Sequence, residues 1–508
     1  MVLKLAVVGL YVFILVVIAL WSSKRIANVS DFFIAGRQVG PWVSAFAYGT
    51  TYFSAVMFVG YAGKLGWGFG MNTMWIVAGN VLIGSLLAWL ILARRTRSMT
   101  TRLDAITMPE FLAERYQAPP FRPLSAAVIF IFLLPYSASV YKGLGHLFAV
   151  NLGLDYLYVE IFMAVITGVY LLIGGYFAVT LTDFFQGIVQ LFGVATMVAL
   201  LVLPLGGLCR AMSLASGPAN APAISAPWPP ATAASATQAL ASGSFPGWLI
   251  LLSLVIITSL GVFGLPQMTQ KFYSIKRLAD IKPAMIISTC FSLIIAGGAY
   301  FSGALSHLYF TAQTVPADPD MIMPQLLYDQ TPAWFSVLIL LVVLAASMST
   351  LASLVLVASA AVSVDMFGLR TRGSDADPRG VAILRALCGV FIAISVIIAS
   401  YKVTFIVNLM VISWGALAGS FMAPYIYGLF WRRANIPGAL AAMFTGLCTS
   451  VTLFIVWKAP GVPVAGALAM LLPLLVMPVV SGLTRPPDQQ HVARVFAEEQ
   501  GPQQQAAK

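Results

Sequence analysis

Apolar runs long enough to cross a lipid bilayer follow one another along this chain, and short polar connections separate them. A spanning helix needs about 20 mostly apolar residues, and a helix satisfies its own backbone hydrogen bonds in lipid. The sequence therefore predicts an all-α integral membrane protein with about thirteen transmembrane helices. The expected spans are 4–22, 42–63, 72–94, 123–150, 157–177, 183–204, 247–265, 284–307, 334–364, 381–400, 404–430, 436–457 and 462–483.

The charge content supports a membrane location. Charged residues make up 9% of the chain, whereas a soluble domain carries about 25%. The net charge of +11 lies in short clusters between the apolar runs, so we expect a lipid bilayer as the partner and no nucleic acid. The four cysteines form no close pair, which predicts neither a disulfide framework nor a zinc site.

The basic residues predict the orientation. Of 28 Lys and Arg residues, 22 fall in the connections and tail of one side, five fall on the other side, and Lys142 lies within a span. Short cytoplasmic loops carry the excess of Lys and Arg. We therefore expect an inner or plasma membrane protein with its N-terminus outside and its C-terminus in the cytoplasm, which requires an odd number of spans.

The expected organisation is one transmembrane domain over 1–483. Its connection 206–246 is rich in Ala, Ser and Pro and is predicted to be a mobile external loop. The polar segment 484–508 is predicted to be a disordered cytoplasmic tail.

Two spans contain sequences that break helices. The second has the small and hydroxyl residues GTTYFS at its centre, and the seventh contains GVFGLP, which ends at Pro266. Close helix packing also uses small residues, but transporters use broken helices to aim free backbone groups at ions and solutes. The two spans are five apart, as expected if spans 2–6 and 7–11 are inverted five-helix repeats.

Hydroxyl residues line the ninth span, where Ser349 and Thr350 are adjacent. Such side chains often bond to carbonyls of their own helix one turn back. Alternatively, two neighbouring hydroxyls and freed carbonyls would make an oxygen cage suited to a hard monovalent cation.

Charges within spans are functional hypotheses by default. Asp183 is either an N-capping carboxylate at the start of the sixth span or a cation ligand near the inner gate, and Lys142 either snorkels or faces the solute. The sequence has no phosphate-binding loop, metal-ligand cluster or nucleophile–base motif, which argues against an enzyme and against an ATP-driven pump.

Six segments together resemble the sodium/solute symporter family, over most of residues 5–460, with FGLPQMTQKF most similar to the proline and pantothenate branch. The segments are DFFIAGR (31–37), ITMPEFLAERY (106–116), GGYFAVTLTDFFQG (174–187), FGLPQMTQKF (263–272), AASMSTLAS (345–353) and APYIYGLFWRRAN (423–435).

The resemblance implies a leucine-transporter-type fold and sodium-coupled alternating access. It also implies a second sodium site at Asp183 and Ser353, although Ala352 stands where members with that site have a hydroxyl. The main sodium site would use backbone oxygens of Thr50, Phe53 and Ala346 and the hydroxyls of Ser349 and Thr350.

The resemblance further implies a solute site at the midplane. Its residues are mostly aromatic and apolar, which disfavours a sugar, and Val262 and Thr258 replace the aromatics of the proline transporters. The expected solute is small and carboxylate-bearing: an amino acid, a monocarboxylate or a pantothenate-like acid. By position the solute-binding residues would be Tyr52, Ser54, Met57, Trp75, Tyr141, Leu265 and Trp414.

The leading hypothesis is a sodium-coupled secondary active symporter for such a solute, with sodium co-transported. The alternatives are proton coupling through Asp183 with the same fold, a transport-like membrane sensor, and a channel.

Overall fold

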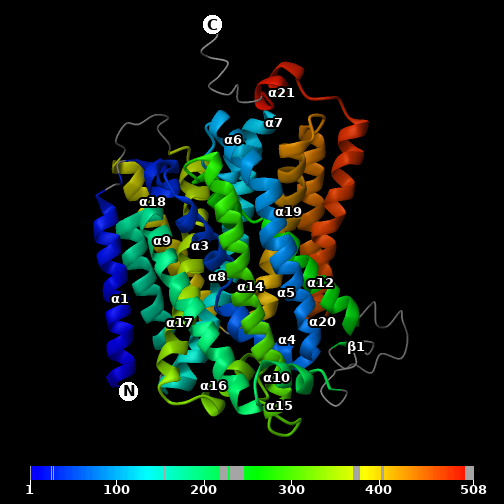
Figure 1. Ribbon diagram of the computed structural model, residues 1–508. Helices are drawn as coiled ribbons and strands as arrows, with labels where there is room; N and C mark the ends of the chain where they lie inside the picture. The colour runs from blue at the N-terminus through cyan, green and yellow to red at the C-terminus, as the bar shows by residue number, and fades with distance from the viewer. Residues whose placement is uncertain are drawn as a thin grey trace.

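The computed structural model is a bundle of long helices that run between two ends (Figure 1). It describes residues 2–24, 26, 28–153, 155–217, 227–228, 245–369, 378–401 and 406–497. We call the end that carries α16 and the N-terminus the α16 end, and the opposite end, with α7 and α21, the α7 end (Figure 1).

Nearly all described residues are helical, and the label η marks stretches of π- or 3₁₀-helix. The α-helices are α1 (Val2–Ser23), α2 (Val29–Ile34), α3 (Pro41–Tyr52), α4 (Ala62–Phe69), α5 (Met74–Gly79), α6 (Arg94–Arg102), α7 (Met108–Tyr116), α8 (Phe121–Leu152), α9 (Tyr156–Val202), α10 (Leu208–Ala215), α12 (Gly247–Leu260), α13 (Pro266–Tyr273), α14 (Ile281–Ala304), α15 (Ser306–Tyr309), α16 (Ile322–Gln330), α17 (Phe335–Ala360), α18 (Pro378–Ser400), α19 (Ile406–Phe430), α20 (Ile436–Leu483) and α21 (Gln489–Val495). The remaining elements that matter below are η2 (Val56–Tyr61), η4 (Asn80–Leu87), η8 (Gly261–Phe263), η10 (Pro319–Met321), η11 (Ala361–Met366) and the paired strands β1 (Pro227–Trp228) and β2 (Phe245–Pro246).

Among the described residues, ten helical stretches are long and apolar enough to cross a membrane. Three of them have 47 to 49 residues, which at 1.5 Å per residue is about twice the thickness of the hydrocarbon core. Each of the three contains a residue with a non-helical backbone, namely Gly70, Gly175 or Lys458. Division at these points gives thirteen crossings, as the sequence predicts.

Both predicted helix breaks are present. After α3 ends at Tyr52, Phe53 is extended (φ −110°, ψ 105°) and helical backbone resumes at Ala55. In the seventh span, α12 gives way to η8, and Leu265 is extended before α13 begins with a proline. Proline suits the first position of a helix because its missing N–H has no partner there.

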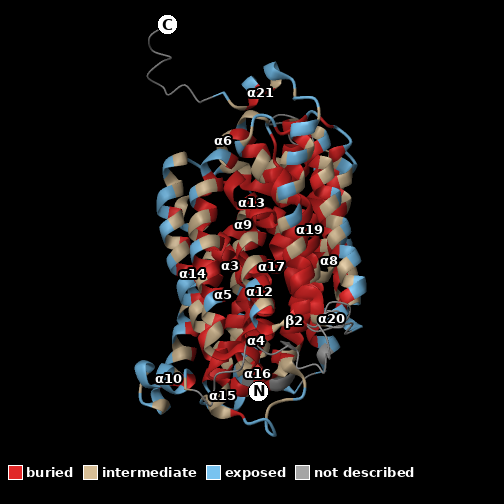
Figure 2. Cartoon of the chain, turned by 90° about the vertical axis from the view of Figure 1, so that its right-hand side faces the viewer, coloured by how far each residue is buried: buried red, intermediate tan, exposed pale blue. Residues whose placement is uncertain are grey.

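Burial follows the position of each helix in the bundle. In the apolar windows of α17 and α19, 83% and 94% of the residues are buried, against 22% in α1. Figure 2 shows this buried interior around α3, α13, α17 and α19. Large apolar side chains on the outer helices, such as Phe13, Leu90 and Phe192, are exposed, as expected of surfaces that face lipid.

The tail is partly ordered, contrary to the predicted disorder. Asp488 caps α21 by accepting a hydrogen bond from the backbone of Gln490. Val495 is buried and its carbonyl accepts from Arg102, while the Arg115 guanidinium lies 5.0 Å from the Phe496 ring centre. A short helix with one apolar face therefore docks on the α7 end, and residues 498–508 lie outside the described part.

The connection 206–246 is also partly regular. It begins with α10, and the short strands β1 and β2 pair at its far end. The segments 218–226 and 229–244 of the predicted mobile loop lie outside the described residues.

Ion pairs link helices at both ends of the bundle. At the α7 end, Arg122 contacts Glu110 at 3.2 Å and Asp365 at 2.9 Å. At the α16 end, Lys142 lies 3.4 Å from buried Asp320, which also accepts from the backbone N–H of Ile406 at 3.1 Å. Lys142 therefore pairs with a carboxylate near the end of the bundle.

Candidate functional site

A cluster of five oxygens lies where the broken end of α3 meets the middle of α17. The Ser349 hydroxyl is 3.1 Å from the carbonyls of both Thr50 and Ala346. The Thr350 hydroxyl is 3.3 Å from the carbonyls of Thr50 and Thr51 and 3.1 Å from that of Ala346. Because α3 stops at Tyr52, its last carbonyls have no partner within the helix and face α17.

This cluster has more acceptors than hydrogens. Each hydroxyl has a single hydrogen to donate, yet the two hydroxyls make five contacts of 3.1 to 3.3 Å with three carbonyls. The contributing residues Thr50, Thr51, Ser349 and Thr350 are all buried. A dry group of oxygens with spare lone pairs suits a hard cation.

Four of the five predicted sodium ligands meet in this cluster: Thr50, Ala346, Ser349 and Thr350. The Thr51 carbonyl joins them, although it was not among the predicted ligands. Phe53 directly follows α3, and its ring stacks on Tyr52 at 4.4 Å between ring centres. Its role as a ligand stays a prediction.

A second polar cluster lies one turn along α17, toward the α7 end. Ser353 is 3.1 Å from the Thr51 hydroxyl and accepts a hydrogen bond of 3.0 Å from the Lys271 ammonium. The same ammonium lies 3.5 Å from Asp183 and 5.1 Å from the centre of the Tyr176 ring. Lys271 comes from α13, so four helices meet at this point.

Asp183 does not cap a helix. The predicted sixth span begins at this residue, but the structure breaks α9 at Gly175, whose backbone is left-handed (φ 56°, ψ −157°). Asp183 therefore lies two turns inside the second half of α9, and the N-cap hypothesis is wrong. Its carboxylate points to Lys271 instead.

A small cavity beside the break holds several of the predicted solute residues. Its volume is ≈ 20 Å³, room for about one water, so the site is closed in this structure. The Trp414 ring stacks on Tyr52 at 6.3 Å and meets Tyr136 edge-on at 5.9 Å. The cavity is lined by Tyr52, Phe53, Ser54, Met57, Tyr61, Asn80, Thr258, Tyr300, Met410 and Trp414.

Three predicted solute residues are not part of this lining. The Trp75 side chain is 67% exposed on the surface of the bundle, so its predicted position in the site is wrong. Tyr141 and Leu265 are buried but do not line this cavity. Conversely, Asn80 lines the cavity without having been predicted, although a lone amide within an apolar span is a signal for such a position.

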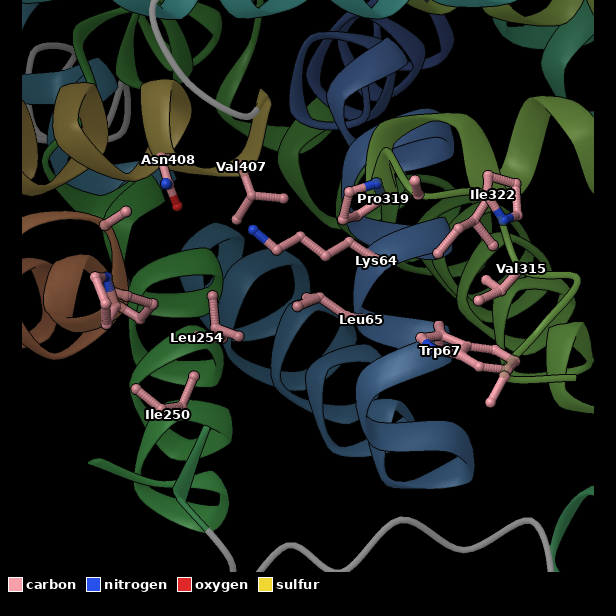
Figure 3. Close-up of a pocket in the computed structure, with 16 residues that line it drawn as sticks. Lys64, Leu65, Trp67, Ile250, Leu254, Val315, Pro319, Ile322, Val407 and Asn408 are labelled. Carbon is pink, nitrogen blue, oxygen red and sulfur yellow. The ribbon is translucent and has the colours of Figure 1, made fainter. Parts of the chain in front are cut away.

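A larger cavity of ≈ 560 Å³ lies toward the α16 end, between α4, α12, α19, α20 and the segment before α16. The Lys64 side chain extends into it toward Val407 and Asn408 (Figure 3). Leu254 of its lining is one helical turn from Thr258 of the small cavity. The large cavity therefore leads toward the closed site. About one turn of α12 lies between the two cavities.

Comparison with known proteins identifies the chain. The sequence profile of the sodium:solute symporter family matches residues 32–446. The chain belongs to this family. The symporter is thus a sodium-coupled solute transporter and not an enzyme, which confirms the predicted family, transport function and co-transported ion.

Relatives and a solved structure agree with this assignment. The symporter is 28% identical to the osmoregulated proline transporter OpuE of Bacillus subtilis, over 94% of this chain and 92% of the relative. It is 29% identical to sodium/proline symporter 2 of Staphylococcus saprophyticus, over 89% and 86%. A Na⁺-coupled sialic acid symporter, solved substrate-bound and outward-open, superposes with a TM-score of 0.75 at 17% identity, over 96% of this chain and 98% of that one. This likeness confirms the leucine-transporter-type fold.

Proposed function

We propose that this symporter takes up proline or a closely related small carboxylate solute, driven by sodium bound between α3 and α17. The observation that carries the proposal is the buried five-oxygen cluster at the α3 break, in a member of a sodium:solute symporter family. The names of the relatives, a proline transporter and a sodium/proline symporter, support the solute class.

The cluster suggests how sodium and solute are coupled. Residues 50 and 51 present carbonyls to the cation, and residues 52–54, which follow directly, line the solute cavity. Sodium bound at the cluster would fix the position of the α3 break and so order Tyr52 and Ser54 for the solute. Sodium release would loosen α3 from α17 and allow the site to open on the other side.

The orientation is part of the proposal. The distribution of Lys and Arg assigns the α16 end to the outside and the α7 end to the cytoplasm of a plasma membrane. The Lys64 cavity then faces outward as an access vestibule, and the Arg122 ion pairs with Glu110 and Asp365 hold the cytoplasmic side closed.

The proposal is tested with purified protein in liposomes. We expect radiolabelled L-proline to accumulate when an inward sodium gradient is imposed, and not when potassium or choline replaces sodium. Prolinamide, which lacks the carboxylate, should compete poorly with radiolabelled L-proline. Competition by short carboxylates and other amino acids then gives the order of solute preference. Accumulation that follows a pH gradient in sodium-free buffer would instead establish the proton-coupled alternative.

Lys64 offers a test of carboxylate attraction in the vestibule. A cation in a cavity with apolar walls raises the local concentration of an anionic group. We therefore expect Lys64→Gln to raise the KM for the solute ~5-fold at low ionic strength with little change in Vmax, and added choline chloride to reduce the difference by screening.

The matched control is Lys4→Gln, which removes a charge from the same end of the bundle, where Lys4 bonds to the carbonyl of Asn151. It should leave the KM unchanged. An equal KM in the Lys64→Gln protein and the wild type, at low ionic strength, would show that the vestibule charge does not attract the solute.

A further inference from the structure

The Lys271 ammonium lies where the family resemblance places a second sodium. Asp183 and Ser353 are the residues expected to hold that ion, and both contact the ammonium, at 3.5 and 3.0 Å. The side chains of Lys271 and Asp183 are 1% and 0% exposed. We propose that Lys271 is a tethered cation that replaces the second sodium of this symporter, a proposal that rests on the sodium coupling proposed above.

The surroundings of the ammonium resemble those of a bound cation. It faces a carboxylate from α9, a hydroxyl from α17 and the Tyr176 ring, whose centre is 5.1 Å away. A cation near the face of an aromatic ring is attracted by its quadrupole. Ser353 also contacts the Thr51 hydroxyl at 3.1 Å, so the ammonium is joined through one hydroxyl to the α3 break.

A sodium ion could not share this place. It would have to sit beside the ammonium on the same carboxylate, where like charges repel. The side chain of Ala352 supplies no oxygen at the neighbouring position of α17. The site therefore lacks both the free charge and the full set of ligands that a second sodium would need.

A cation that is covalently part of the chain, as the Lys271 ammonium is, has a functional consequence. Ser353 is four residues from Ser349, about 6 Å along the helix, so the fixed charge neighbours the proposed sodium cluster. A sodium ion bound at Asp183 could dissociate into the cytoplasm and add its gradient to the transport cycle. An ammonium on α13 cannot dissociate, so only the cluster at α3 and α17 exchanges sodium, and one sodium moves per solute.

The proposal is tested by equilibrium binding of ²²Na⁺ to the purified, full-length symporter. We expect the wild type to bind one sodium per chain with a Hill coefficient near one. Lys271→Ala combined with Ala352→Ser frees the carboxylate and restores the hydroxyl. Asp183 Oδ1 makes no hydrogen bond within the described residues, so both carboxylate oxygens become available. We expect this variant to bind two sodium ions, and its thermal unfolding to shift further with sodium than that of the wild type.

Further variants keep the test decisive if that protein is unstable. Asp183→Asn leaves the buried ammonium without its counter-charge and should lower the melting temperature, whereas Asp183→Asn with Lys271→Met removes both charges and should restore it. Two sodium ions bound by the wild type, or equal melting temperatures for these two variants, would overturn the proposal.

The outcome is separable from that of the proposed function. If the wild type binds no sodium, the proposed cluster at α3 and α17 is wrong. The tether is then still supported by one sodium gained in the Lys271→Ala, Ala352→Ser protein, and contradicted if that folded protein gains none.

Discussion

Replacement of Ser349 and Thr350 together by alanine is expected to abolish sodium-driven uptake. The two hydroxyls supply the side-chain oxygens of the cluster between α3 and α17. A hydrogen bond to a charged group contributes about 1.5–3 kcal/mol, so the loss of both ligands should weaken sodium binding at least ~100-fold. The initial rate of uptake, measured over a series of sodium concentrations, reports this loss.

Ser347→Ala is the matched control. The Ser347 hydroxyl donates to the Val343 carbonyl of its own helix at 2.6 Å and is buried like the other two. The Ser347→Ala protein should retain the sodium dependence of uptake that the wild type shows. Unchanged uptake in the Ser349→Ala, Thr350→Ala protein would remove these hydroxyls from the sodium site, and loss in the Ser347→Ala protein would show that any change in α17 is disruptive.

Gly303→Ala is expected to prevent folding or destabilise the symporter severely. α14 crosses α4 at this glycine so closely that an added Cβ would lie 1.9 Å from the backbone oxygen of Ala62. Backbone atoms cannot rotate away as a side chain can. The loss of folding free energy should therefore reach the upper part of the range for overpacked cores, about 3 kcal/mol. The yield of monodisperse protein and its melting temperature in detergent measure the effect.

Gly297→Ala tests the same substitution on the same helix. An added Cβ there meets nothing within 4 Å, so the melting temperature should stay close to that of the wild type. Equal melting temperatures for the Gly303→Ala and Gly297→Ala proteins would contradict the close approach of α14 and α4.

The helix breaks could be predicted from the sequence because their cause is local. Glycine, proline and hydroxyl residues interrupt the apolar runs at Gly49–Ser54 and Gly261–Pro266, and both spans break there. The adjacent hydroxyls of Ser349 and Thr350, together with freed carbonyls, predicted an oxygen cage, but the particular carbonyls came from the resemblance to the family.

The direction in which membrane side chains point could not be predicted. Lipid is as apolar as the protein interior, so an aromatic residue such as Trp75 gives no sign of whether it faces the bundle or its outside. The pairing of Lys271 with Asp183 was equally hidden, because the two residues are 88 positions apart and meet only once α13 packs against α9. The docking of α21 depends on Phe496 meeting Arg115 and Arg432, which no local pattern reveals.

Sodium binding at the α3 break is the central claim, and ²²Na⁺ binding to the purified symporter in the absence of solute tests it most directly. We predict saturable binding to the wild type and to Ser347→Ala, and its loss when Ser349 and Thr350 are both replaced by alanine. Equal binding by the wild type and that double variant would contradict the account.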